Sequence, residues 1–241
     1  MRRRPPRRDV RARSGRGAAR RHAADRALAP DRVLSPILAR PPVPALAIFD
    51  CDGVLVDSEP ISNAVLAQAL TRVGLPTTAR AALSEFRGLH MSDVVARAEA
   101  RLGGPLPEGW VPDYERERAN AFRQSLTATP GAAEAVRAVR AAGIAVCVAS
   151  QGRREKTELT LSLTGLREMF APDAIFSAYT VQRGKPHPDL FLHAAATMGV
   201  APERSVVIED TTVGVAAALA AGMRVLGYAT TGEADAQALA D

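Results

Sequence analysis

Short apolar runs alternate with helix-like patterns along most of this 241-residue chain. The apolar and β-branched runs predict five strands, at Leu46 to Phe49, Ile144 to Ala149, Ala174 to Ser177, Ser205 to Ile208 and Arg224 to Tyr228. Helical patterns separate most of them, at Gly131 to Ala142, Arg153 to Leu163, Pro188 to Met198 and Val213 to Ala221. Strands that alternate with helices predict an α/β fold of three layers, in which helices cover both faces of a parallel sheet.

The stretch between the first two predicted strands is more than eighty residues long, far more than one crossover helix requires. It contains amphipathic helical patterns of its own, at Ile61 to Val73, Ser92 to Leu102 and Pro112 to Leu126. We therefore expect a helical domain at 60–126, inserted into a core formed by 44–59 and 127–232. A C-terminal extension is expected at 233–241.

The positive charge of the chain is concentrated at its N-terminus. Residues 1–43 contain 13 Arg and 3 Asp, a net charge of +10, so that 44–241 carry a net charge of −5. This segment is rich in Arg, Pro and Ala and lacks amphipathic periodicity, so we expect a disordered tail. Such an arm can bind nucleic-acid phosphates or act as a transit peptide. An over-long start site in an Arg-biased coding sequence is the simpler explanation, so nucleic acid is not the expected partner.

We expect a protein of the cytoplasm that works as a monomer. Cys51 and Cys147 both lie in apolar, strand-like runs, which predicts buried, reduced thiols and no disulfide. No apolar run approaches the length of a membrane span, so we expect no membrane partner.

The first predicted strand ends in two carboxylates one residue apart, Asp50 and Asp52, followed by Gly53. Like charges so close destabilise a strand end unless a cation lies between them. Mg²⁺ takes carboxylate and carbonyl oxygens and leaves sites for phosphate oxygens. For an isolated motif, a plain strand end with an Asx turn would be the better interpretation. The ends of the other strands favour the metal.

In an open parallel sheet, ligands bind beyond the carboxyl ends of the strands. Those ends supply a hydroxyl, an amide, an ammonium group and two more carboxylates, from Ser150, Gln151, Lys185, Glu209 and Asp210. Together they predict a site for a metal ion and a phosphate. Lys185 is one of two lysines in a chain with 29 arginines, which indicates that its loop requires a compact ammonium group.

These residues resemble the motifs of the haloacid dehalogenase superfamily, in its branch of sugar-phosphate phosphatases and β-phosphoglucomutase-like enzymes. The resemblance extends from Ala45 to about Tyr228. Its four motifs occur in order as Asp50-Cys51-Asp52-Gly53-Val54, Ser150, Lys185 in Gly184-Lys185-Pro186-His187-Pro188-Asp189, and Glu209-Asp210-Thr211-Thr212-Val213-Gly214. Each motif alone is weakly specific, but four in order at strand ends are a strong signal. The resemblance implies a Rossmann-like core, with the inserted helices as a cap over the site.

The resemblance also implies a mechanism. Asp50 would attack phosphorus and form an aspartyl-phosphate, and Asp52 would protonate the leaving oxygen and then help to activate water. Mg²⁺ would be held by Asp50, the backbone carbonyl of Asp52 and Asp210, with Glu209 as an outer or partial ligand.

The remaining roles concern the substrate. Ser150 and nearby backbone N–H groups would bind phosphoryl oxygens, and Lys185 would balance the charge of nucleophile and phosphate. Gln151 and Arg87 are the predicted substrate-binding residues. Arg87 precedes the second predicted cap helix, where relatives often place recognition residues, and its donors suit an acidic or hydroxylated group. An ordinary solvated loop is an equally good interpretation of that stretch.

The primary prediction is therefore a Mg²⁺-dependent phosphoric monoester hydrolase of small metabolites, such as sugar, sugar-acid or phosphoglycolate-like phosphates. A sugar phosphomutase is the alternative within the fold, although the cap segment around Ser62 lacks the histidine that β-phosphoglucomutases carry there. Cys147 and Arg153 have the spacing of cysteine-dependent phosphatases, but Cys147 is expected in the middle of a strand. A nucleic-acid-associated protein that uses the basic tail is the alternative from another class.

Overall fold

The computed structural model describes residues 43–229. The expected tail, apart from Val43, and the expected C-terminal extension at 233–241 lie outside the described residues. None of the described helices combines the length and the apolar character that crossing a membrane requires.

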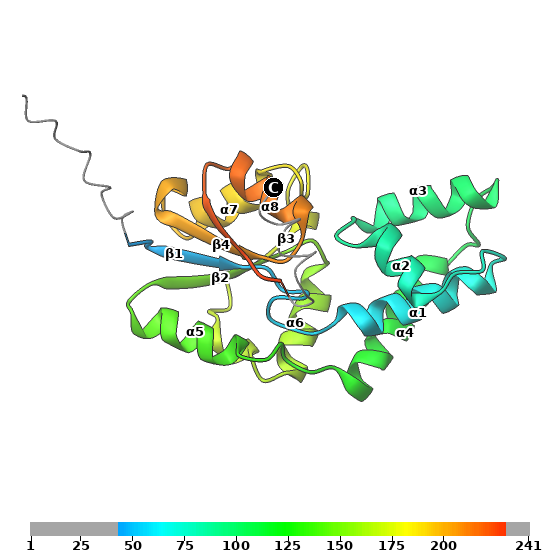
Figure 1. Cartoon of the computed structure of the whole chain (residues 1–241), viewed down its shortest axis with the longest axis horizontal. Helices are drawn as coiled ribbons and strands as arrows, with labels where there is room; N and C mark the ends of the chain where they lie inside the picture. The colour runs from blue at the N-terminus through cyan, green and yellow to red at the C-terminus, as the bar shows by residue number, and fades with distance from the viewer. Residues whose placement is uncertain (1–42, 230–241) are drawn as a thin grey trace, which may run out of the picture. The chain divides into compact units, whose positions relative to one another are not determined.

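Five parallel strands form the central sheet, in the order β3-β2-β1-β4-β5 (Figure 1). They are β1 (Leu46–Phe49), β2 (Ala145–Ser150), β3 (Ile175–Ser177), β4 (Ser205–Glu209) and β5 (Arg224–Gly227). Each predicted strand is present, with its ends within one residue of the expected positions. The α/β prediction is thereby confirmed, and β1 lies at the centre of the sheet.

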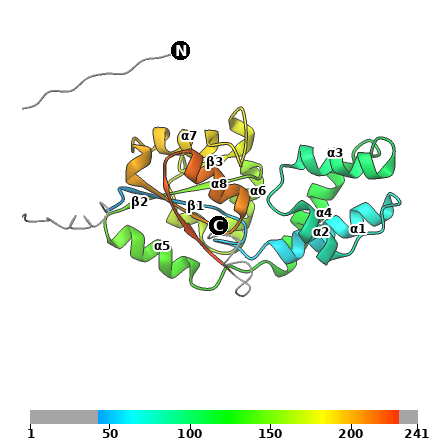
Figure 2. The ribbon, with the colours of Figure 1, turned by 45° about the horizontal axis from the view of Figure 1, so that its top comes forward.

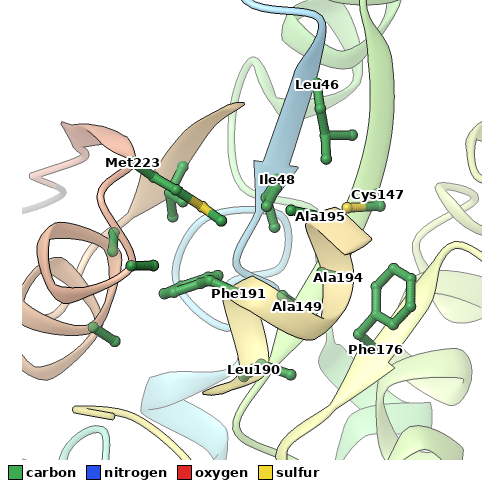
Figure 3. Close-up of a cluster of buried hydrophobic side chains, with 14 of the residues drawn as sticks. Leu46, Ile48, Cys147, Ala149, Phe176, Leu190, Phe191, Ala194, Ala195 and Met223 are labelled. Atoms are coloured by element: carbon green, nitrogen blue, oxygen red, sulfur yellow. The ribbon is translucent and has the colours of Figure 1, made fainter. Parts of the chain in front are cut away.

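Helices cover both faces of this sheet (Figures 1 and 2). They are α5 (Ala132–Ala141) and α6 (Arg154–Leu163) on one face, and α7 (Asp189–Thr197) and α8 (Thr212–Ala220) on the other. Short 3₁₀ turns occur at Arg167–Met169, Ala178–Thr180 and Pro202–Arg204. In Figure 3, Phe191 of α7 lies near Ile48 of the central strand, and both side chains are fully buried. Burying an apolar side chain of this size contributes about 1.5–3 kcal/mol, which explains why the strands read as continuous apolar runs.

Four of the five helices between β1 and β2 precede α5 and pack together, apart from the sheet. They are α1 (Glu59–Arg72), α2 (Ala79–Phe86), α3 (Met91–Leu102) and α4 (Trp110–Ser125). They share a separate apolar cluster, in which the Trp110 ring stacks on Tyr114 with centroids 5.8 Å apart. The sequence did not predict α2, because its eight residues bury only Ala82 and Phe86, too few to establish a periodicity. The domain boundaries at 60 and 126 stay predictions.

The register of the sheet brings the strand ends together. Phe49 pairs with Val148 of β2 and with Ile208 of β4, and the backbone N–H of Asp50 donates to the Ile208 carbonyl at 2.9 Å. The residues that follow β1, β2 and β4 therefore meet at one edge of the sheet. A turn at Gly53, with φ +83°, then leads the chain away from this edge.

Candidate active site

Lys185 lies at the centre of the candidate site, between two carboxylates from neighbouring strands. Its Nζ donates to Oδ1 of Asp50 at 2.6 Å and to Oε2 of Glu209 at 2.7 Å. All three side chains are buried. Glu209 is held further by Thr211, whose hydroxyl donates to Oε1 at 2.6 Å. Burial disfavours the charged ammonium, but the two carboxylates outweigh it and raise the pKa of Lys185 above its ordinary value.

Asp210 completes a cluster of three carboxylates. Oxygens of Asp50, Glu209 and Asp210 lie within 4.8 Å of one another. Burial, and next the Glu209 charge, raise the pKa of Asp50 well above its ordinary value and that of Asp210 to about 7. Oδ1 of Asp210 is buried without a hydrogen-bond partner. An excess of buried negative charge with an unpartnered oxygen fits a hard cation, so this cluster can hold a metal ion.

Two glycines leave the space that these carboxylates occupy. A Cβ on Gly53 would lie 2.1 Å from Oδ2 of Asp210, and a Cβ on Gly214 would lie 2.0 Å from the carboxyl carbon of Glu209. Both positions are too close for any side chain. Gly214 belongs to the first turn of α8, where Thr211 caps the helix by accepting from the Gly214 N–H at 3.1 Å.

Asp52 does not join the carboxylate cluster through its side chain but forms a second ion pair. Lys156 of α6 and the hydroxyl of Ser58 both donate to its Oδ1. Burial alone would raise the pKa of Asp52, but the Lys156 charge and these two hydrogen bonds bring it below its ordinary value. Each of the two carboxylates that follow β1 therefore has a lysine partner of its own. Sequence reasoning missed Lys156, although the scarcity of lysine that marked Lys185 applies to it equally.

Ser150 and Gln151 lie at the end of β2, as expected. Ser150 is fully buried, and its Oγ accepts from the Gly152 N–H at 3.1 Å. The Gln151 amide spans the backbone of Lys185, accepting from its N–H at 3.0 Å and donating to its carbonyl at 3.3 Å. Gln151 therefore fixes the loop that carries the ammonium group. Its predicted contact with substrate stays a prediction.

A cavity of about 160 Å³ opens above these residues. Its lining includes Asp50, Asp52 and Lys185 from the strand-end side, and Arg87 from the loop between α2 and α3. Arg87 is engaged by two carboxylates, with Nε 3.0 Å from Glu59 and Nη2 2.9 Å from Asp210. The arginine thus reaches the carboxylate cluster directly, and substrate binding by Arg87 stays a prediction.

The two cysteines do not form a reactive site. Cys51 and Cys147 are free and fully buried. Burial raises the pKa of the Cys51 thiol to about 12 and that of Cys147 above its ordinary value, so neither is a thiolate near neutral pH. The arrangement therefore disfavours a cysteine-dependent phosphatase.

Comparison with known proteins agrees with this geometry. A family model described as haloacid dehalogenase-like hydrolase matches residues 47–228. The 6-phosphogluconate phosphatase of Escherichia coli K12 is 31% identical over 178 residues, which are 73% of this chain and 79% of the relative. Hexitol phosphatase B of the same strain is 33% identical over 180 residues, which are 74% of this chain and 80% of the relative. A crystal structure of a HAD family hydrolase from Deinococcus radiodurans R1, with bound phosphate and sodium, has a TM-score of 0.64 at 35% identity and covers 83% of this chain and 89% of that one.

Proposed function

The chain belongs to the haloacid dehalogenase-like hydrolases, and on that premise we propose that it hydrolyses phosphate monoesters of small sugars or sugar acids through a phosphorylated Asp50. The observation that carries this proposal is the cluster of Asp50, Glu209 and Asp210 beside a cavity, with a buried ammonium group paired to the first two. Phosphoryl transfer requires positioning and charge neutralisation more than other covalent chemistry, and this group supplies both.

Mg²⁺ is the proposed cofactor. Asp50, Asp210 and the backbone carbonyl of Asp52 would hold it, with Glu209 beside them, and the unpartnered Oδ1 of Asp210 supports this assignment. When bound, the ion supplies positive charge that orients the phosphoryl oxygens and offsets the carboxylates.

In the first step, a carboxylate oxygen of Asp50 forms a bond to phosphorus while the bond from phosphorus to the leaving oxygen breaks. Lys185 holds Asp50 in place and offsets the charge of the incoming phosphate. Ser150 and nearby backbone N–H groups bind the phosphoryl oxygens. Asp52, which is a carboxylate in the free enzyme, must take up a proton when substrate binds, and it donates this proton to the leaving oxygen, which departs as an alcohol.

In the second step, water attacks the phosphorus of the aspartyl-phosphate, releasing inorganic phosphate and restoring Asp50. Asp52 accepts a proton from that water. Lys156 and Ser58 support this role because they stabilise Asp52 as a carboxylate.

The names of the relatives support the substrate class. One is a 6-phosphogluconate phosphatase and another a hexitol phosphatase, so each name refers to a phosphorylated sugar acid or sugar alcohol. The two free, buried cysteines are in keeping with a reduced compartment, and we propose that the enzyme works as a monomer in the cytoplasm.

The experiment is to incubate the purified full-length chain with a panel of phosphate monoesters, with and without Mg²⁺, and to measure inorganic phosphate. We expect phosphate from sugar or sugar-acid esters only with Mg²⁺. The panel includes β-glucose 1-phosphate, analysed also for glucose 6-phosphate. Faster formation of glucose 6-phosphate than of phosphate would replace the hydrolase with a mutase. No turnover of any ester would contradict the proposal.

A further inference from the structure

The basic side chains that line the cavity differ in whether a carboxylate neutralises them. Four are paired, Lys185 with Asp50 and Glu209, Lys156 with Asp52, Arg87 with Glu59 and Asp210, and Arg153 with Glu115. Arg118 is the exception, because it lines the cavity but has no ion pair among residues 43–229. The cavity therefore presents one guanidinium that forms no salt bridge with residues 43–229.

Two aromatic rings hold Arg118 in position. Arg118 lies on α4, one turn after Tyr114 and one turn before Phe122, and both rings are buried. Its guanidinium carbon is 4.9 Å from the centroid of Tyr114 and 6.0 Å from that of Phe122. Its Nη1 also donates to the Tyr114 hydroxyl at 3.4 Å. A guanidinium that is already ordered loses little conformational entropy when it binds an anion, so it is suited to recognition.

An unpaired arginine on a helix is most often a solvated one, and Arg116 on the same helix provides the comparison. The Arg116 side chain is 63% exposed and pairs with Asp113 at 2.7 Å. Arg118, in contrast, is half-buried and faces the cavity. Its guanidinium therefore lies in the wall of the cavity and not on the outer surface, where a molecule bound in the cavity can reach it.

Arg118 also lies on the side of the cavity where a leaving group would be. Lys156, which donates to Asp52, has its Nζ 5.9 Å from the centroid of the Phe122 ring, and the guanidinium carbon of Arg118 is 6.0 Å from the same centroid. Arg118 and Asp52 both line the cavity, so Arg118 is on the side of the group that protonates the leaving oxygen. The part of the substrate beyond that oxygen is the part it can reach.

We infer that Arg118 binds a carboxylate on the leaving-group part of the substrate, so that the preferred substrates are phosphate monoesters of small acids and not of neutral polyols. The inference rests on the proposed function and narrows it. One unpaired guanidinium matches one carboxylate, which it can bind through two parallel hydrogen bonds. A second phosphate group carries up to two negative charges and would leave charge uncompensated in the same place.

The test compares two esters that differ only at the end far from the phosphate. 6-Phosphogluconate ends in a carboxylate, whereas sorbitol 6-phosphate ends in a hydroxymethyl group. We expect the full-length wild type to prefer the acid in kcat/KM by about 10- to 100-fold, the range of a charged hydrogen bond. Arg118→Gln should remove this preference mainly by raising KM for the acid, and Arg118→Lys should retain part of it. Arg116→Gln removes the same charge from the outer side of α4. It should leave kcat/KM unchanged for both esters.

Three outcomes would overturn the inference. The wild type could have equal kcat/KM for the two esters, Arg118→Gln could lower kcat/KM equally for both, or Arg116→Gln could lower kcat/KM for the acid as much as Arg118→Gln does. Hydrolysis of p-nitrophenyl phosphate with Mg²⁺ would show that the chain is a phosphatase even where the inference about Arg118 is wrong. If no ester is hydrolysed, calorimetric titration of both esters into wild type and Arg118→Gln still decides the matter. Tighter binding of the acid that Arg118→Gln abolishes supports the inference, and equal binding contradicts it.

Discussion

Replacing Gly214 with alanine places a methyl group where Glu209 now lies. The Cβ would be 2.0 Å from the Glu209 carboxyl carbon, whereas ordinary contacts begin at 3.4 Å, so the carboxyl group must move by about 1.4 Å. Glu209 is fully buried and is held at 2.7 Å by Lys185 and at 2.6 Å by Thr211. A shift of this size lengthens both contacts to about 4 Å, which is beyond hydrogen-bonding range.

Two opposing effects then decide the stability of Gly214→Ala. Alanine in a helix is favoured over glycine by at most about 1 kcal/mol. Two hydrogen bonds to a charged group contribute about 1.5–3 kcal/mol each. The net expectation is a loss of about 2–5 kcal/mol, which for a domain of this size lowers Tm by roughly 4–20 °C. We also expect weaker Mg²⁺ binding and lower activity, because Glu209 no longer faces Lys185.

The assay is thermal unfolding by circular dichroism at several Mg²⁺ concentrations, with kcat/KM for p-nitrophenyl phosphate. Gly104→Ala is the matched control, because a Cβ there meets nothing within 4 Å, and it should leave Tm and activity unchanged. A Gly214→Ala variant as stable and as active as the wild type would refute the reasoning, since helix propensity would then have outweighed the overlap.

Two further predictions concern the charges and the thiols. Lys156→Gln removes the main influence that lowers the pKa of Asp52, so this pKa rises. With p-nitrophenyl phosphate, whose leaving group needs no acid, Asp52 acts only as the carboxylate base of the second step, so the acidic limb of the kcat profile should move to higher pH. If the acidic limb does not move, it does not report the pKa of Asp52. EDTA should abolish activity and Mg²⁺ should restore it, whereas thiol alkylation of the native enzyme should have little effect because Cys51 and Cys147 are buried. Activity that survives EDTA but is lost on thiol alkylation would favour a cysteine-dependent mechanism instead.

The sheet and its strand-end residues were predictable because the information is local. A short apolar run bounded by turn residues, such as Leu46 to Phe49, is typical of a strand buried on both faces, and the polar residue that follows each such strand lies at one edge. Asp50, Glu209 and Asp210 were found in this way, and Lys185 was found from its loop after the third strand and from the scarcity of lysine.

The residues that were missed depend on packing between distant segments. Lys156 meets Asp52 across 104 positions of sequence, and nothing in the α6 pattern indicates which of its polar residues faces the site. Arg118 lies on a helix that was predicted, but its direction depends on where the Tyr114 and Phe122 rings are buried. The short helix α2 shows no clear hydrophobic periodicity in the sequence, because only two of its residues are buried and the neighbouring helices determine which they are.

The central claim is that Asp50 carries the phosphoryl group. The direct measurement is to mix Asp52→Ala with p-nitrophenyl phosphate and Mg²⁺, quench in acid and analyse the peptides by mass spectrometry. The leaving group of this ester needs no acid, and loss of Asp52 slows the second step, so the intermediate should accumulate. We predict one phosphoryl group on the peptide that contains Asp50, and none when Asp50→Asn is combined with Asp52→Ala. A phosphoryl group on another residue, or full turnover by Asp50→Asn alone, would contradict the account.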